Sequence, residues 1–172
     1  MININNFKLI AHRGLLEGPS KELENSLILI KNNFKKYPFI INEIDIWIGK
    51  KIFFGHEISG QIVKPSFLIE NSKNLILHIK NIDTKFPESI ELFKLLNNKC
   101  HIYAHDSDNF TITNKGWIWS HPKLGMIPRT ICVMPETFID INSNKFLKNL
   151  HLLSGVCTDF PIKILDLKYI NL

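Results

Sequence analysis

The 172-residue sequence lacks several features that would assign it to a special class of protein. No apolar run reaches the roughly 20 residues that cross a bilayer, which predicts neither a transmembrane helix nor stable membrane insertion. Residues 1–8 carry no basic start and no apolar stretch typical of a secretory signal. The three cysteines, Cys100, Cys132 and Cys157, show no paired spacing and lie in apolar stretches, as small buried side chains do. We therefore expect a cytoplasmic protein without disulfides.

The sequence also lacks a basic block. Its formal net charge is +5, but the lysines are scattered singly or in pairs, which argues against a nucleic-acid partner. A mildly positive field instead suits a small anionic substrate. No repeat or low-complexity linker interrupts the chain, so we expect one domain over residues 1–172. Nothing in the sequence indicates an oligomeric state.

Strand patterns alternate with helix patterns along the chain. Strands are predicted at 7–11, 39–48, 51–54, 75–79, 100–104, 117–119, 130–134 and 155–158, and helices at 24–36, from Pro87 onward and at 143–152. This alternation predicts an α/β protein with a largely parallel sheet. The strand count favours a compact TIM-like (β/α) barrel with a reduced helical layer, because a full barrel takes about 250 residues. An open doubly wound sheet is the alternative.

Polar residues gather where predicted strands end. His12-Arg13 follows the first strand, His56-Glu57 follows the hairpin at 51–54, and His105 begins a polar run through Asp108. In a parallel barrel such positions converge on the rim that carries active sites. A structural role is the simpler interpretation of three further histidines, His101, His121 and His151. Core packing explains Trp117 and Trp119 better than ligand binding does.

Glu43 and Asp45 lie two residues apart in a predicted strand, so their side chains point to the same face. Two carboxylates are costly to bury side by side among apolar neighbours, and a divalent cation would remove that cost. Oxygen ligands favour Mg²⁺ or Ca²⁺. A solvated sheet face is the alternative, but Ile41, Ile44 and Trp47 leave little room for one.

Four ordered motifs resemble those of the glycerophosphodiester phosphodiesterase family, within the superfamily of phosphatidylinositol-specific phospholipase C. Between residues 8 and 161 they are Ile10-Ala-His-Arg-Gly14, Glu24-Asn25-Ser26, Glu43-Ile-Asp45 with Gly55-His56-Glu57, and Gly155-Val-Cys-Thr-Asp-Phe-Pro161. The resemblance implies a (β/α) barrel that hydrolyses a small phosphodiester. The sequence departs from the family in its short length, in Glu57 where an aspartate is usual, and in a shorter span from Asp45 to His56.

The resemblance also implies roles for individual residues. His12 and His56 would be the acid/base pair, and Arg13 and Lys80 would contact the phosphate. Glu43 and Asp45 would ligate the metal, while His78 stands where the family has a third carboxylate ligand. Two histidines with pKa values near 6.5 suit proton transfer at neutral pH.

Two other functions stay open. A binding or regulatory protein could keep this fold after losing turnover, and the His78 replacement favours that possibility. A phosphodiester lyase could release a cyclic phosphate, although no lipid-facing amphipathic helix is evident. Substrate specificity would lie in the loops predicted at 15–21, 59–65 and 107–115.

Overall fold

The computed structural model describes residues 2–3, 7–55, 60–105, 108–167 and 170–171. The strands are β1 (Ile2–Asn3), β2 (Lys8–Ala11), β3 (Ile41–Ile48), β4 (Ile52–Phe54), β5 (Gln61–Val63), β6 (Leu75–Ile82), β7 (His101–Tyr103), β8 (Phe110–Ile112), β9 (Ile118–Ser120), β10 (Ile131–Val133), β11 (Gly155–Thr158) and β12 (Ile170–Asn171). The α-helices are α1 (Leu27–Lys36), α2 (Pro65–Glu70), α3 (Pro87–Lys99), α4 (Asn144–Asn149) and α5 (Pro161–Leu165). Short 3₁₀ turns lie at η1 (His12–Gly14), η2 (Pro122–Leu124), η3 (Pro135–Thr137) and η4 (Leu150–Leu152).

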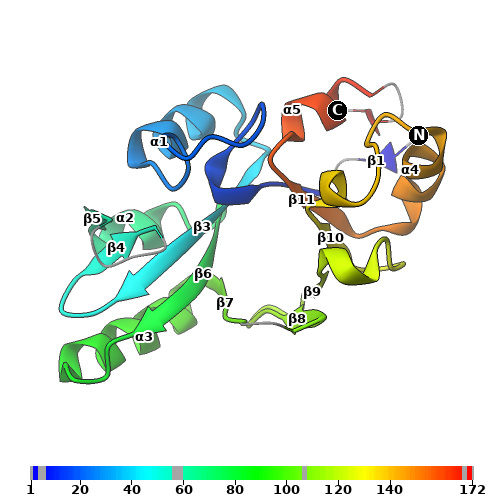
Figure 1. Ribbon diagram of the computed structural model, residues 1–172. Helices are drawn as coiled ribbons and strands as arrows, with labels where there is room; N and C mark the ends of the chain where they lie inside the picture. The colour runs from blue at the N-terminus through cyan, green and yellow to red at the C-terminus, as the bar shows by residue number, and fades with distance from the viewer. Residues whose placement is uncertain (1, 4–6, 56–59, 106–107, 168–169, 172) are drawn as a thin grey trace.

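Ten of these strands form one mixed sheet. The strands β7, β6, β3, β2, β11, β10 and β9 follow one another as parallel neighbours, and Figure 1 shows them along an arc. The strand β8 adds antiparallel to β9, and the β4–β5 hairpin adds antiparallel to β3. The protein is therefore α/β, as predicted.

Strand pairing does not close the sheet. In the described ranges no strand pair joins β7 to β8. Asn114, just after β8, crosses this gap with two hydrogen bonds. Its side-chain oxygen accepts from the Ile102 backbone N–H, and its backbone N–H donates to the Ile102 carbonyl. The predicted closed barrel is thus not confirmed at the level of strand pairing.

Helices cover two parts of the outer face of the sheet. Alternate residues of β3, Ile44, Ile46 and Ile48, are buried in a cluster with Leu68 of α2 and Leu96 of α3. A second cluster packs α4 and α5 against β2, β10 and β11, and Figure 1 shows these two helices on the opposite side from α1, α2 and α3. Burial of these apolar side chains is the main stabilising contribution to the fold.

The inner face of the sheet holds a third apolar cluster. It contains Ile10, Ile76, Tyr103, Trp119, Ile131, Val133 and Cys157, contributed by strands β2, β6, β7, β9, β10 and β11. Trp119 is fully buried there, as the sequence predicts, whereas Trp117 is only half-buried. The three cysteines are buried and free, which agrees with the expectation from their apolar surroundings.

Most predicted elements occur with shifted ends. The helix predicted over 24–36 begins at Leu27, because the Ser26 hydroxyl caps it by accepting a hydrogen bond from Leu29 N–H. Two segments predicted as loops contain strands: β5 lies within 59–65 and β8 within 107–115. Short strands of three residues carry too little alternation to be recognised from sequence. None of the helices in the described ranges is long and apolar enough to cross a membrane.

Candidate functional site

Two buried carboxylates lie on the inner face of β3. Glu43 and Asp45 are 1% and 2% exposed, so the solvated-face alternative is wrong. They alternate with Ile44, which faces the helices, and they therefore point away from the helical layer. Register places Asp45 beside His78 of β6, and His78 beside Tyr103 of β7. The predicted metal ligands thus come together on neighbouring strands.

His78 contacts both carboxylates through one ring nitrogen. Its Nδ1 lies 2.9 Å from Asp45 Oδ1 and 3.6 Å from Glu43 Oε1. The imidazole stacks on Tyr103, with ring centroids 4.5 Å apart and an interplanar angle of 13°. Its other nitrogen, Nε2, is buried without a hydrogen-bond partner among the described residues. His78 is therefore fixed with Nδ1 toward the acidic pair.

Tyr103 provides a further hydrogen bond to Glu43. Its hydroxyl donates a hydrogen bond of 2.9 Å to Glu43 Oε1. Burial, followed by the negative charge of Glu43, raises the pKa of Tyr103 well above 10. Tyr103 therefore stays protonated and remains a hydrogen-bond donor at physiological pH.

The turn His12–Gly14 brings a cation to the carboxylates. Arg13 adopts a left-handed conformation with φ of 53°, which is uncommon for a residue with a side chain. Its backbone N–H donates to Glu43 Oε2 at 3.0 Å, and its Nε lies 3.2 Å from Asp45 Oδ2. Burial lowers the pKa of Arg13, but Glu24 and Asp45 raise it by more. The strained turn thus holds a permanent positive charge against two buried acids.

Each residue of Glu24-Asn25-Ser26 has a separate contact. Glu24 accepts a 2.8 Å hydrogen bond from the Arg13 guanidinium. The Asn25 side chain accepts from the Asp45 backbone N–H at 2.9 Å and donates to Asp45 Oδ2 at 3.3 Å. Ser26 caps α1. This segment therefore orients both Arg13 and Asp45.

A buried amide attaches the turn to the fold behind it. The Asn33 side chain on α1 donates to the Gly14 carbonyl and to Asn42 Oδ1, both at 2.7 Å. Gly14 has φ of 76°, and a Cβ there would lie 3.3 Å from Ile30. Glycine is required at this position by conformation and by space.

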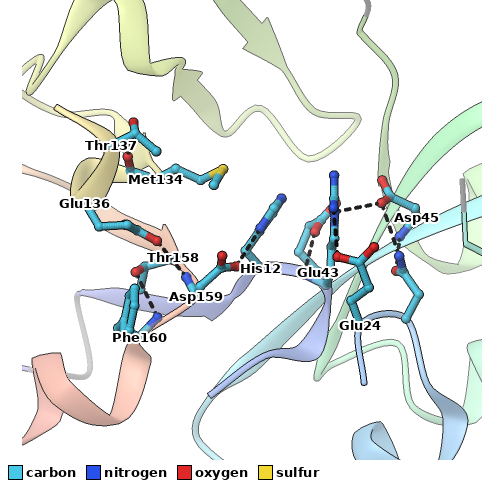
Figure 2. Close-up of polar contacts among 12 residues, drawn as sticks. His12, Glu24, Glu43, Asp45, Met134, Glu136, Thr137, Thr158, Asp159 and Phe160 are labelled. Atoms are coloured by element: carbon cyan, nitrogen blue, oxygen red, sulfur yellow. Dashed lines mark hydrogen bonds and ion pairs between the residues drawn. The ribbon is translucent and has the colours of Figure 1, made fainter. Parts of the chain in front are cut away.

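His12 is held by an acid from the other end of the chain. Its Nδ1 lies 2.8 Å from Asp159 Oδ1, and the Asp159 backbone N–H donates to Glu136 Oε1 at 2.9 Å. Figure 2 shows His12 between Asp159 and Glu43. Burial lowers the pKa of His12, but the Asp159 hydrogen bond and the charges of Glu43 and Asp159 outweigh it and raise the pKa above 6.5. With Nδ1 engaged, Nε2 is the nitrogen that can exchange a proton with a ligand.

The geometry of the acidic pair with His78 fits one metal ion. One ligand atom from each of Glu43, Asp45 and His78 lies within 4.8 Å of the others. Around an ion with bonds of about 2.1 Å, neighbouring ligands are about 3.0 Å apart in an octahedral site and about 3.4 Å apart in a tetrahedral one. The distances from His78 Nδ1 to Asp45 and Glu43, 2.9 and 3.6 Å, bracket these values. The three residues could therefore hold a metal ion.

Among the described residues, one predicted site residue stands apart from this cluster. Lys80 lies in β6 and is exposed, and the pairing with β3 skips it because Ile46 pairs with Ile79 and Trp47 with Asn81. None of the described contacts joins Lys80 to the acidic pair. His56, the predicted second acid/base group, lies outside the described residues, as does its neighbour Glu57.

Sequence reasoning missed the supporting residues Tyr103, Glu136 and Asp159 as members of the site. Asp159 belongs to a motif that pointed to the family, but its contact with His12 spans 147 residues and follows from the pairing of β11 with β2. Tyr103 carries a weaker signal, since it alternates with His101 in a short strand. No sequence signal indicated Glu136.

No protein-family model matches this chain, and neither a curated protein nor a solved structure matches it. The function therefore has to be argued from the geometry of the site itself.

Proposed function

We propose that this chain is a metal-dependent phosphodiester hydrolase on a compact TIM-like barrel, resembling the glycerophosphodiester phosphodiesterases. The observation that carries the proposal is the buried group Glu43, Asp45 and His78 with His12 and Arg13 beside it. A structural core has little reason to bury two carboxylates and an imidazole beside a partly buried guanidinium and a second imidazole, because each charge costs free energy to desolvate.

The barrel part of the proposal rests on topology. Seven consecutive parallel neighbours and an inner apolar cluster supplied by six of these strands are what a barrel requires. Asn114 bridges β7 and the end of β8 where a closed barrel would have its last strand pair. A short chain can form such a barrel if some connections lack helices.

The charge balance supports a divalent cation. Glu24, Glu43 and Asp45 carry three negative charges around Arg13, which supplies one positive charge. These four side chains together are two negative charges in excess. A Mg²⁺ or Ca²⁺ ion would neutralise this excess, and the nitrogen ligand would favour Mn²⁺ over Ca²⁺. When bound, the ion supplies positive charge to offset the charge that develops on a reacting phosphate.

The acid/base role falls first to His12. Asp159 fixes its tautomer and ring orientation, and the raised pKa keeps a larger fraction protonated near neutral pH. A protonated Nε2 can donate to the oxygen of a leaving alcohol. We assign His56 the complementary role of base on the attacking oxygen. The attacker would be water or a neighbouring hydroxyl of the substrate.

A second candidate is a binding protein without turnover, and one observation favours it. The Arg13 guanidinium is already engaged by Glu24 and Asp45, so it contacts a phosphate only through its remaining N–H groups. The exposed Lys80 is likewise apart from the acidic pair. In this alternative a phosphodiester would bind without being cleaved.

An assay of diester cleavage tests the proposal. Bis(p-nitrophenyl) phosphate and glycerophosphodiesters are incubated with wild type, His12→Gln and Asp45→Asn, with Mg²⁺, Ca²⁺ or Mn²⁺ and with a chelator. We expect wild-type turnover that needs the metal. We expect His12→Gln to lose at least about 100-fold, since general acid–base catalysis contributes about 10² to 10⁴. We expect Asp45→Asn to lose the metal-dependent turnover, because it removes an anionic ligand.

Glu91→Gln is the matched control, because it removes an equally charged carboxylate whose only described partner is the exposed Lys94. It should keep wild-type turnover. Wild type that is inert on every diester, yet binds glycerophosphodiesters by calorimetry, would favour the binding protein. Turnover unaffected by Asp45→Asn would remove the metal site from the mechanism.

A further inference from the structure

A cavity lies at the end of the sheet opposite to the acidic pair. It has a volume of about 280 Å³ and is lined by Lys8, Gly116, Trp117, Ile118, Arg129, Ile131 and Ser154. These residues lie at or just before the amino ends of four adjacent strands, β2, β11, β10 and β9. The acidic pair and His12 lie toward the carboxyl ends of the strands, so the cavity is separate from the site described above.

Two cations line this cavity. Lys8 Nζ lies over the ring of Trp117, 5.6 Å from its centroid, and this contact holds the ammonium group near the cavity. Arg129 supplies the second cation. Within the described ranges neither side chain forms an ion pair with a carboxylate, and no acidic residue lines the cavity. The lining therefore carries two positive charges that no carboxylate of the described residues pairs with.

The backbone at Arg129 is strained. Its φ is 63°, in the left-handed region that glycine adopts at little cost, and its N–H donates to the Leu152 carbonyl at 2.8 Å. A non-glycine residue in this region costs free energy, and such strain is concentrated at binding sites. The Arg129 side chain is exposed, and none of the described contacts ties it to the protein, so its guanidinium is available to a ligand. The left-handed backbone at Arg129 is therefore explained if its guanidinium binds a ligand.

Nearby residues add to the positive field. Lys115 adjoins the lining residue Gly116, and its charge acts on His101, whose ring meets Trp117 edge-on at 4.4 Å. Burial and then Lys115 lower the pKa of His101 to about 4, so His101 is neutral at physiological pH. His101 therefore adds no charge to the cavity, and Lys115 extends the positive field beside it.

We infer that this cavity binds a small phosphate-bearing anion at the amino ends of the strands. Two unpaired cations match a phosphate dianion better than a carboxylate, which carries one charge. Arginine offers paired N–H donors, lysine a point charge and Ser154 a hydroxyl, a combination suited to phosphate oxygens. The volume is near the lower end of ligand pockets, about 300 Å³, which favours a phosphate on a short carbon chain. This inference does not depend on the proposed hydrolase activity.

Nuclear magnetic resonance provides a local test. Inorganic phosphate, glycerol 3-phosphate and acetate are titrated into ¹⁵N-labelled protein, and the indole N–H of Trp117 is assigned with Trp117→Phe. We expect saturable shifts of this signal with glycerol 3-phosphate, weaker ones with acetate, and loss of binding at high salt. A tighter response to inorganic phosphate than to glycerol 3-phosphate would identify the free ion as the ligand.

Two variants make the test decisive. Arg129→Gly removes the cation and relieves the left-handed strain, so it should weaken binding at least about tenfold without lowering the melting temperature. Lys8→Gln should weaken binding to a similar degree and keeps the inference testable if the first variant folds poorly. Lys35→Gln removes an exposed cation from α1 and should leave binding unchanged.

Any one of three results would overturn the inference. These are the absence of any Trp117 response to all three anions, wild-type affinity in both cavity variants, or equal weakening by Lys35→Gln. The last would show general charge attraction and no specific site.

Discussion

The two ends of the parallel sheet hold charge in opposite ways. Toward the carboxyl ends, Glu43 and Asp45 are almost completely buried, and each is contacted by Arg13 and His78. At the amino ends, Lys8 and Arg129 contact no carboxylate in the part of the chain that the structure describes. Buried charges persist only when they are paired, whereas the half-buried Lys8 and the exposed Arg129 are screened by water. The carboxyl end is therefore preorganised, and the amino end is free to respond to anions.

The largest effect is expected from a change at the amino end that leaves every charge in place. In Gly155→Ala, the added Cβ would overlap the backbone carbonyl of Lys8, because β11 and β2 approach too closely for a side chain. A backbone carbonyl cannot move aside without breaking the β2–β11 pairing, so we expect a loss of at least about 3 kcal/mol in the free energy of unfolding. Chemical denaturation measures it.

Gly49→Ala is the control for this prediction. A Cβ at Gly49 would meet only the Lys51 carbonyl, at 3.9 Å, which is ordinary contact. Its stability should change by less than about 1 kcal/mol. Equal stability of the two variants would mean that the β2–β11 contact is not as close as described.

The second prediction concerns the pairing of charge at the carboxyl end. His78→Glu would place a third carboxylate beside Glu43 and Asp45, so in metal-free buffer like charges repel and stability falls. Ca²⁺ or Mg²⁺ should then bind about tenfold more tightly than in wild type, because an anionic oxygen replaces the nitrogen. Thermal melts with and without metal, together with calorimetry, measure both effects.

Activity in the same variant separates two interpretations of His78. The contacts of Nδ1 fit a metal ligand, but they also fit a protonated imidazole that donates to Asp45 and replaces part of the metal charge. We expect wild type to be active and His78→Glu to be weaker on the natural substrate. An inert wild type with an active variant would mean that the native chain has lost the enzyme function. His78→Gln controls for loss of the ring without added charge.

The third prediction tests the pair His12 and Asp159. Asp159→Asn should lower the pKa of His12, because the hydrogen bond and charge that oppose burial are weakened. A histidine whose folded pKa is raised contributes stability fully below about pH 6.5, and that contribution is lost as the pH rises through the folded pKa. The stability difference between wild type and variant should therefore be largest in mild acid and shrink at alkaline pH.

Proton titration of His12 by nuclear magnetic resonance and denaturation across a pH series measure these two effects. Asp166→Asn removes an exposed carboxylate at the end of α5 and serves as the control. A pKa of His12 unchanged by Asp159→Asn would show that Glu43 alone sustains the proton, and Asp159 would lose its positioning role.

The contrast between the two ends of the sheet also explains which site residues could be predicted from the sequence. The cluster of Glu43, Asp45 and His78 was predictable because the first two alternate on one strand and match an ordered motif series, while His78 occupies the position of the family's third ligand. The supports were not predictable, because Tyr103 reaches Glu43 across 60 residues and Asp159 reaches His12 across 147 residues. Such contacts depend on strand register, which a local pattern does not determine. The sequence did not indicate Lys8 and Arg129 as site residues, since scattered cations have the pattern of a solvent-exposed surface.

The smallest effect is expected from one charge at the amino end. Burial, and then the positive charge of Lys115, lower the pKa of His101 to about 4. Lys115→Gln should therefore raise this pKa only part of the way toward 6.5, because burial remains the larger cause. Proton titration of the His101 ring measures the change, with Lys35→Gln as a control for net charge. A complete return to 6.5 would show that charge, not burial, dominates there. No change would show that Lys115 exerts no field at this end. An intermediate shift would instead support an amino end where the charge of Lys115 acts on its surroundings without a neutralising carboxylate among the described residues.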